Sequence, residues 1–190
     1  GSIKDRVACY CVRRAKERGD ITGKKAVIEA CSGTLGVSLA MTCAVLGYHL
    51  YVVMTTDIPR AQLAQIERYG AVMYPVDPES GMAEAVHKAR LENEDNWHSW
   101  YFNQFENPDC VELHRMTTGP EIAADMEREG LHIDAFIDAV ASGATISGVG
   151  AYLKERDSSV FVRAVEPAES PVLSGGSPGR HGICGVGFGF

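Results

Sequence analysis

The sequence predicts an α/β fold in which a largely parallel β-sheet carries helices on both faces. Apolar stretches short enough to be strands alternate along the chain with stretches of helical length and pattern. Two of the expected strands, 26–29 and 133–140, run into turns rich in small residues that lead straight into helices. Alternation of this kind needs crossover connections, and crossovers join parallel strands. Ligands of such folds lie beyond the carboxyl ends of the strands, which is where both turns are placed.

Periodicity and the residues that begin or end helices define the expected elements. A helix over 5–17 has an apolar stripe and is closed by Gly19, and a helix over 59–69 begins at Pro59, a residue that helix N-termini favour. A helix over 112–128 has a candidate break at Gly119-Pro120, and a loop is expected from residue 167 onward. The other expected elements are strands 26–29, 48–54, 71–76, 97–102, 133–140 and 160–165 and helices 37–46, 81–93 and 146–156.

Composition limits the classes of function. The chain has 190 residues, 45% of them hydrophobic, which is enough for one or two domains, with a seam expected near 107–108. Its net charge of −7 argues against nucleic acid or an anionic membrane as the main partner. No apolar run has membrane-spanning length and no signal peptide is visible, so we expect a soluble, cytoplasmic protein. Both ends look internal to a longer chain.

The six cysteines and six histidines do not form a metal-binding pattern. The sequence contains no CxxC pair, and no histidine lies at metal-ligand spacing. We therefore expect no metal site, and we expect reduced, mostly buried thiols of a cytosolic protein rather than a disulfide framework. The histidines are expected to be mostly surface or packing residues.

The turn at 141–148, ASGATISG, has the features of an anion site. A strand that turns at once into a helix leaves backbone N–H groups free at the helix N-terminus, and the helix dipole favours an anion such as phosphate there. Ser142, Thr145 and Ser147 add hydroxyls. The alternative is an ordinary turn that needs small residues only for tight packing. The turn at 31–36, CSGTLG, is built in the same way.

Lys4 is the candidate for covalent chemistry. It opens a helix, and the positive end of the helix dipole favours the neutral amine that reacts with an aldehyde. A lone lysine is more often a surface residue. A lysine and two anion-suited turns on one α/β scaffold, however, would suit pyridoxal phosphate (PLP), with Lys4 holding the aldehyde and the ASGAT turn the phosphate. The CSGTLG turn, with Ser32, would then hold a substrate carboxylate.

Six motifs occur in order along the chain: GSIKDR at 1–6, CSGTLG at 31–36, QF-ENP at 104–108, TTGPEI at 117–122, VEPAESPVLSGG at 165–176 and GVGFGF at 185–190. This set resembles the cysteine synthase/cystathionine β-synthase family of fold-type II PLP enzymes, and the resemblance covers essentially the whole chain. It implies two three-layer αβα domains of the tryptophan synthase β-like class, truncated here at both ends. Residues 1–107 would carry the lysine, the substrate loop and a mobile subdomain of about 48–93, and residues 108–190 the phosphate loop.

The resemblance also implies a role for each matching residue. Lys4 would be the Schiff-base lysine and the proton shuttle at the substrate α-carbon. The substrate would be bound by Cys31, Ser32, Gly33, Thr34, Leu35, Gln104 and Gly185. The cofactor would be bound by Lys4, Thr34, Ser142, Gly143, Ala144 and Thr145. The family's serine partner for the pyridine nitrogen lies in a C-terminal region that this sequence does not include.

The chain departs from the family pattern in both loops. The family has TSGNTG where this chain has CSGTLG, so Cys31, Thr34 and Leu35 replace threonine, asparagine and threonine. In the phosphate loop, GTGGT becomes ASGAT, which places methyl groups at Ala141 and Ala144. One lost hydrogen bond to the substrate carboxylate would cost about 1–3 kcal/mol, which weakens binding without abolishing it.

Three functions remain open at this point. The first is β-replacement on O-acetylserine or another O-activated serine, in which sulfide adds to an aminoacrylate intermediate to give L-cysteine. The second keeps the chemistry with other substrates: cystathionine β-synthase, cyanoalanine synthase, cysteine β-lyase or a diaminopropionate-type synthase. The third is a non-catalytic sensor or binding protein on the same fold. The expected partners are a small amino-acid substrate and a second copy of the chain in a homodimer.

Overall fold

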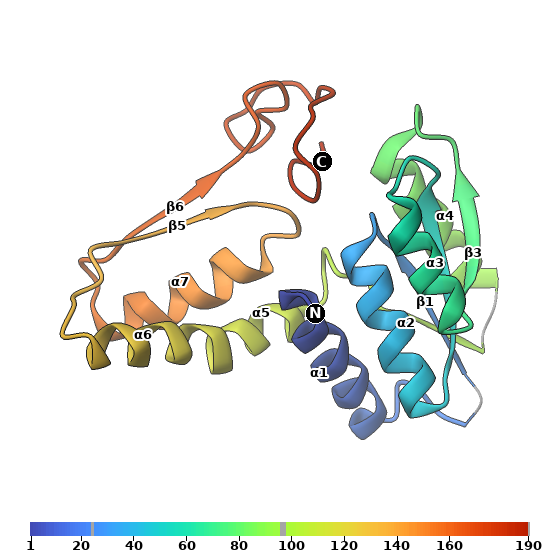
Figure 1. Ribbon diagram of the computed structural model, residues 1–190, viewed down its shortest axis with the longest axis horizontal. Coiled ribbons are helices and arrows are strands. Elements are labelled where there is room, and N and C mark those ends of the chain that lie inside the picture. The colour runs from blue at the N-terminus through green and yellow to red at the C-terminus, as the bar shows by residue number, and fades with distance from the viewer. Residues whose placement is uncertain (24, 96–97, 190) are drawn as a thin grey trace. The chain divides into compact units, whose positions relative to one another are not determined.

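The computed structural model describes residues 1–23, 25–95 and 98–189. They form two compact units, Gly1–Asn103 and Gln104–Phe190, each with its own parallel sheet (Figure 1). The assignment of 1–107 and 108–190 to two domains, with a mobile subdomain of about 48–93, stays a prediction.

The first unit contains a four-stranded sheet in the order β3-β2-β1-β4. Every pairing is parallel, which confirms the predicted sheet type. The central strand β1 is buried along its whole length, as expected for a parallel sheet covered on both faces. Its strands are β1 (Ala26–Ala30), β2 (His49–Thr55), β3 (Val72–Val76) and β4 (Ser99–Tyr101). The predicted extended piece 97–102 begins at Trp97, which lies outside the described residues.

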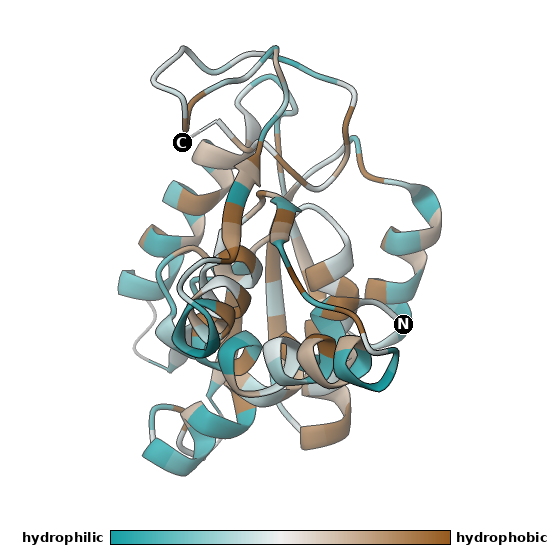
Figure 2. Ribbon diagram, turned by 90° about the vertical axis from the view of Figure 1, so that its left-hand side faces the viewer, coloured by the Kyte–Doolittle hydropathy of each residue, from teal (hydrophilic) through white to brown (hydrophobic). Residues whose placement is uncertain are grey.

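Four helices cover this sheet. Helix α2 packs on β2, α1 and α3 pack on α2, and α4 packs on β1 and β2. The path from β1 to β3 crosses the sheet in one direction and the path from β3 to β4 returns, so right-handed crossovers place α4 on the face opposite α2 and α3. The helices are α1 (Ile3–Arg18), α2 (Thr34–Leu46), α3 (Arg60–Arg68) and α4 (Gly81–Asp95). Polar and apolar residues alternate along the helices in Figure 2, as in helices with one buried face.

The second unit has two parallel strands beside a helical layer. Its elements are α5 (Pro108–Leu113), the π-helix η1 (His114–Thr118), α6 (Gly119–Arg128), β5 (Ala135–Ala139), α7 (Ala144–Arg156) and β6 (Phe161–Val165). Helix α7 packs against η1, α5, α6 and both strands. The core of this unit is a cluster of Ala123, Val149, Leu153 and Val160. The described residues from 167 onward are loop, as predicted.

Four helices begin earlier than the sequence predicted, including the helix predicted over 112–128, whose helical backbone already starts at Pro108 of α5 after the Asn107 cap. Helix α1 starts at Ile3 rather than residue 5, because Ser2 and Asp5 form a capping box. Helices α2 and α7 start at Thr34 and Ala144 rather than at 37 and 146, so the small residues after each glycine are the first helical turn and not part of the loop.

The predicted break at Gly119-Pro120 is wrong. The backbone stays helical through Gly119, with φ −60° and ψ −53°, and the irregularity is the π-helical turn that precedes it. The N–H of Gly119 reaches back to the carbonyl of His114, five residues earlier, and Pro120, which has no N–H, follows in the first turn of α6. A side chain at 119 would lie 2.9 Å from Tyr152, so glycine allows α6 to approach α7 closely.

The cysteines are all free: four are buried (Cys11, Cys31, Cys43, Cys110) and two are exposed (Cys9, Cys184). This confirms the prediction of mostly buried, unpaired thiols. Among the described residues, His, Cys, Asp and Glu side chains do not gather in groups of three that could hold a metal. Within the same residues, none of the helices has both the length and the apolar composition to cross a bilayer.

Candidate active site

Lys4 lies in the first turn of α1, and the residues around it fix that turn. The hydroxyl of Ser2 accepts a hydrogen bond from the Lys4 backbone N–H at 3.2 Å. The Asp5 carboxylate accepts one from the Ser2 N–H at 2.9 Å, which completes the capping box. The lysine is half-buried at the positive end of the helix dipole. The prediction that Lys4 opens a helix is confirmed.

The Asp5 carboxylate also connects α1 to α2. Its Oδ1 accepts a hydrogen bond from the Ser38 hydroxyl at 2.6 Å. Ser38 is 1% exposed and lies one turn after Thr34 in α2. This bond holds the pKa of the Asp5 carboxyl below its ordinary value. The turn that carries Lys4 and the helix that follows the CSGTLG turn are thus joined by a side-chain pair.

The CSGTLG turn follows the carboxyl end of β1 and leads directly into α2. Gly33, the N-cap of α2, has φ +120° and ψ −80°, which a residue with a side chain rarely adopts. No side chain caps this helix. The first-turn N–H groups of Thr34 and Leu35 have no acceptor within the helix, so they are available to an anion.

Cys31 lies inside this turn. Its thiol is fully buried, and this burial, with the nearby Glu29 carboxylate, raises the pKa to about 12. The backbone N–H groups of Gly33 and Gly36 point to the sulfur and oppose that shift only in part. The thiol is therefore protonated at neutral pH, the form that is a poor nucleophile. The Cys31 side chain fills the inside of the turn, and its sulfur accepts hydrogen bonds from backbone N–H groups of the turn.

The other residues of the turn differ in exposure. Thr34 is exposed, Ser32 is half-buried and Leu35 is 3% exposed. The Leu35 side chain belongs to the core, so this residue can reach a ligand only through its backbone. Gln62 of α3 covers Gly33: a Cβ on Gly33 would lie 2.0 Å from the Gln62 Oε1 atom.

Glu29 holds the end of β4 beside this turn. It is a fully buried carboxylate in the middle of the sheet. Its Oε2 atom accepts a hydrogen bond of 2.7 Å from the backbone N–H of Asn103. Asn103 has φ +53°, which is unusual for a residue with a side chain. Glu29 therefore fixes the backbone that leads directly into Gln104, itself 6% exposed.

The predicted phosphate turn of the second unit has the same design. It follows the carboxyl end of β5, and its N-cap, Gly143, has φ +80°. No side chain caps α7, so the N–H groups of Ala144 and Thr145 remain for a ligand. Gly148 lies one turn later, where a Cβ would lie 2.3 Å from the Val111 carbonyl oxygen, so glycine lets α7 lie directly on α5.

His114 of the π-helix η1 contacts this turn. It is fully buried in η1, and its Nε2 atom lies 3.4 Å from the Thr145 hydroxyl. Its Nδ1 atom lies 2.8 Å from the Thr118 hydroxyl. The imidazole thus connects the π-helix to the second residue of α7. Within the predicted phosphate loop, this side-chain contact fixes the position of the Thr145 hydroxyl.

The last described residues return to the end of β5. The N–H of Gly187 donates to the Val140 carbonyl at 3.0 Å, and the His181 Nε2 atom lies 2.9 Å from the Gly187 carbonyl oxygen. The rings of Phe105 and Phe188 meet edge to face, with centroids 5.7 Å apart. The QF-ENP and GVGFGF motifs therefore meet in the second unit; Phe190, the last residue of the motif, lies outside the described residues. Gly185 is exposed and has φ +81°.

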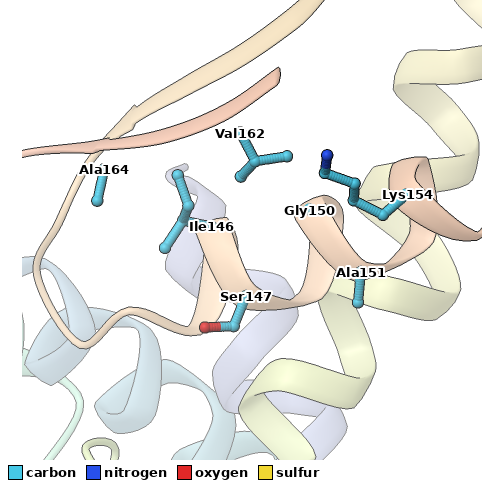
Figure 3. A pocket seen from close by; sticks show the side chains of 7 residues that line it. All are labelled: Ile146, Ser147, Gly150, Ala151, Lys154, Val162 and Ala164. Atoms are coloured by element: carbon cyan, nitrogen blue, oxygen red, sulfur yellow. The ribbon is translucent and has the colours of Figure 1, made fainter. Parts of the chain in front are cut away.

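A shallow hollow lies between α7 and β6 (Figure 3). It is lined by Ile146, Ser147, Gly150, Ala151, Lys154, Val162 and Ala164. The Lys154 ammonium donates to the Ser158 carbonyl at 2.8 Å. The lining has no carboxylate, thiol or imidazole, so it provides no general base for chemistry.

Four supporting residues were not found from the sequence: Asp5, Glu29, Ser38 and His114. Asp5 had a readable signal, because Ser2-Ile3-Lys4-Asp5 fits the capping-box pattern. Glu29 is a charged residue within an otherwise apolar strand, which also marks a buried polar role. The positions of Ser38 and His114 had no such signal. Their partners lie 33 and 31 residues away in sequence.

Comparisons with known proteins agree with this arrangement. The sequence model of the pyridoxal-phosphate dependent enzyme family matches residues 1–185. A cysteine synthase of Staphylococcus aureus is 38% identical over 192 residues, covering 100% of this chain and 60% of that protein. The chain therefore spans about 60% of the length of this curated relative.

Solved structures show the same fold over the whole chain. A cysteine synthase from Entamoeba histolytica superposes with a TM-score of 0.89 at 33% identity, covering 100% of this chain and 55% of that one. A hydrogen sulfide-producing enzyme from Fusobacterium nucleatum superposes with a TM-score of 0.93 at 31% identity, covering 100% of this chain and 57% of that one. These matches confirm the resemblance to cysteine synthases that the six motifs indicated. The chain belongs to the pyridoxal-phosphate-dependent enzyme family and has the α/β fold of its fold-type II members.

Proposed function

We propose that this chain carries the site of a PLP-dependent β-replacement, in which sulfide displaces the leaving group of O-acetylserine or another O-activated serine to give L-cysteine. The curated relatives named cysteine synthase support this reaction. The observation that carries the proposal is that two helices begin, without a side-chain cap, at the carboxyl ends of parallel strands. Two such N-termini suit the two anions involved, a cofactor phosphate and a substrate carboxylate.

The residues of the chain fit the cofactor. Gly143 has the positive φ that brings backbone N–H groups to face one ligand, and Ser142 and Thr145 add hydroxyls. We propose that Ser142, Gly143, Ala144 and Thr145 hold the phosphate. Lys4 would hold the aldehyde carbon. When bound, PLP withdraws electrons from the substrate α-carbon and so makes its proton acidic.

The protein groups would do the rest. The neutral Lys4 amine takes the proton from the α-carbon, and the α1 dipole favours that neutral form. The Ser32 hydroxyl and the backbone N–H groups of Thr34 and Leu35 bind the substrate carboxylate. We propose that Gln104 assists them and that the Thr34 hydroxyl binds the cofactor ring oxygen. We propose that Gly33 belongs to the carboxylate-binding loop and that Gly185 lies beside the substrate; Cys31 supports the loop from inside.

The test uses the full-length protein loaded with PLP. We expect O-acetylserine and sulfide to yield cysteine, and we expect Lys4→Ala to abolish both turnover and the visible absorbance of lysine-bound PLP. Lys16→Ala, in the last turn of the same helix, is the matched control and should retain both. Bound PLP with an unchanged spectrum on addition of O-acetylserine would reject the proposed reaction.

One observation favours an alternative nucleophile or product. The Leu35 side chain is in the core, so the loop lacks a hydroxyl that the family pattern has at this position. A structural neighbour is described as a hydrogen sulfide-producing enzyme, which fits release of sulfide from cysteine on the same scaffold. Parallel assays with cysteine alone, and with serine plus homocysteine, would rank these reactions against cysteine formation.

The remaining expectations are proposals of the same kind. We propose a small amino acid as the substrate, a homodimer as the assembly and the cytoplasm as the location. The substrate class follows from the cysteine synthase relatives, and the dimer from the resemblance to the family. Sedimentation equilibrium of the full-length protein would test the dimer, since a monomer at micromolar concentration would contradict it.

A further inference from the structure

The strongest unassigned feature near the proposed chemistry is the pair Asp5 and Ser38. Asp5 uses both carboxylate oxygens. Oδ2 accepts from the Ser2 N–H at 2.9 Å, and Oδ1 accepts from the Ser38 hydroxyl at 2.6 Å. The first bond closes the turn around Lys4, and the second reaches another helix. Both bonds are charge-assisted, and the O–H···O⁻ bond has the short length of a strong one.

Ser38 connects this carboxylate to the substrate loop. Its hydroxyl carries one hydrogen, and two acceptors lie within reach: Asp5 Oδ1 at 2.6 Å and the Thr34 carbonyl oxygen at 3.0 Å. The ionised carboxylate is closer and is the stronger acceptor, so the hydrogen lies on the Asp5 side. The serine is 1% exposed, and water therefore does not replace this bond.

We propose that Asp5 and Ser38 are positioning residues that set the Lys4 turn against the turn that binds the substrate carboxylate. This inference deepens the proposed function and rests on it for the roles of Lys4 and Ser32. The pair does not touch substrate or cofactor. It fixes the relative position of two helix N-termini that supply the base and the carboxylate site, and a displacement of about 1 Å can cost about 100-fold in rate.

Loss of the pair has a specific consequence at the loop. Without the carboxylate, the Ser38 hydroxyl turns to the Thr34 carbonyl, its other acceptor. A serine that bonds back to the carbonyl four residues earlier bends a helix. The first turn of α2, which presents the N–H groups of Thr34 and Leu35, would then shift relative to Lys4.

The experiment compares Ser38→Ala, Asp5→Ala and the double variant in full-length protein. Each single variant should raise the KM for O-acetylserine about tenfold, while lysine-bound PLP keeps its visible absorbance. The double variant should be no worse than the worse single variant, because both changes remove one interaction. Should Asp5→Ala not fold, Ser38→Ala carries the test alone.

The matched control is Ser99→Ala. Ser99 is also a buried serine of the first unit, and its hydroxyl donates to the Asn93 side chain at 2.9 Å. It should lower the melting temperature comparably but change the KM less than twofold. A KM in Ser38→Ala equal to that of Ser99→Ala would overturn the inference.

Amide hydrogen exchange separates this inference from the proposed function. In protein without PLP, Ser38→Ala should speed exchange in residues 2–5 and 34–38 at least fivefold, and Ser99→Ala should not. Faster exchange in a protein that turns over no activated serine would reject the reaction and keep the pairing. If the wild type turns over normally, and Ser38→Ala changes neither the exchange rates nor the KM, the positioning role of the pair is rejected and the proposed reaction stands.

Discussion

His114 Nε2 lies 3.4 Å from the Thr145 hydroxyl, and Nδ1 of the same ring lies 2.8 Å from the Thr118 hydroxyl. A buried imidazole thus spans from the π-helical turn to the first turn of α7. The π-helix widens the backbone at the residue that carries this ring. Irregular turns of this kind often occur at functional sites. The position of the proposed phosphate hydroxyl therefore depends on a residue that itself is not exposed to a ligand.

His114→Ala is expected to weaken PLP binding about tenfold, because a lost buried hydrogen-bond partner costs about 1–3 kcal/mol. The dissociation constant from an absorbance titration measures this. Pyridoxal, which lacks the phosphate, is the matched control and should bind both proteins equally. If the affinities for PLP and for pyridoxal fell equally, His114 would affect the lysine or the cofactor ring and not the phosphate site.

Gly33→Ala should destabilise the protein for two separable reasons. The φ of +120° is unfavourable for alanine, and the new Cβ would lie 2.0 Å from Gln62 Oε1. Gly47, an αL residue at φ +77° and ψ 28° with open space around it, is the comparison for an ordinary left-handed glycine, where alanine costs about 1–2 kcal/mol. Gly33, at ψ −80°, lies outside that region, so we expect the melting temperature to fall further in Gly33→Ala than in Gly47→Ala. Gln62→Ala combined with Gly33→Ala should recover part of the loss, and no recovery would contradict the contact.

Alkylation of the native protein should distinguish the exposed cysteines from the buried ones. The exposed Cys9 and Cys184 should react with iodoacetamide in the native protein at pH 8, whereas Cys31 and Cys43 should react only after unfolding. Burial raises the pKa of both buried thiols to about 12. Peptide mapping by mass spectrometry measures the modified sites. Rapid labelling of Cys31 in folded protein would show that the CSGTLG turn opens in solution.

The same pKa values predict alkaline instability. A folded-state pKa of about 12, against 9.0 for the ordinary thiol, means that the unfolded chain loses its proton first as the pH rises. The stabilisation is therefore complete below pH 9 and is lost between about pH 9 and pH 12. Cys43→Ala, which removes one of the two groups, should show a shallower fall of the unfolding free energy over this range. An identical slope in the variant and the wild type would contradict the assignment.

The sequence was sufficient for the sheet type and for the strand–turn–helix units, because those depend on local hydrophobic period and on glycine. It misplaced the starts of α2 and α7, since Thr34 and Ala144 have the small side chains of loop residues but occupy the first helical turn. The π-helical turn before Gly119 was also not predicted, because no local pattern marks it; the turn lies against α7, an element distant in sequence.

The site residues also include some that the sequence could predict and some that it could not. Lys4 and the two glycine turns could be proposed from motifs and from the physics of helix N-termini. The contacts that support them could not: Ser38 meets Asp5 from 33 positions away, and Glu29 meets Asn103 from 74. No periodic pattern encodes such pairs, which arise only when two elements pack. Leu35 could be identified as a departure from the family loop, but its burial in the core could not.

The Asp5–Ser38 pair should also be visible in the acid stability of the protein. The Ser38 hydroxyl is the main cause of the lowered Asp5 pKa; burial opposes it and the Ser2 N–H adds to it. A carboxyl whose folded pKa lies below its ordinary 3.8 contributes stability above pH 3.8, and that contribution is lost as the pH falls through the lowered value. The difference in melting temperature between wild type and Ser38→Ala should thus be constant from pH 8 to about 5 and should shrink below pH 3.8. Ser99→Ala, whose partner is an amide, should show a difference that does not depend on pH in this range. A Ser38→Ala difference that persists unchanged at pH 3 would mean that Asp5 is not the acceptor of this hydroxyl.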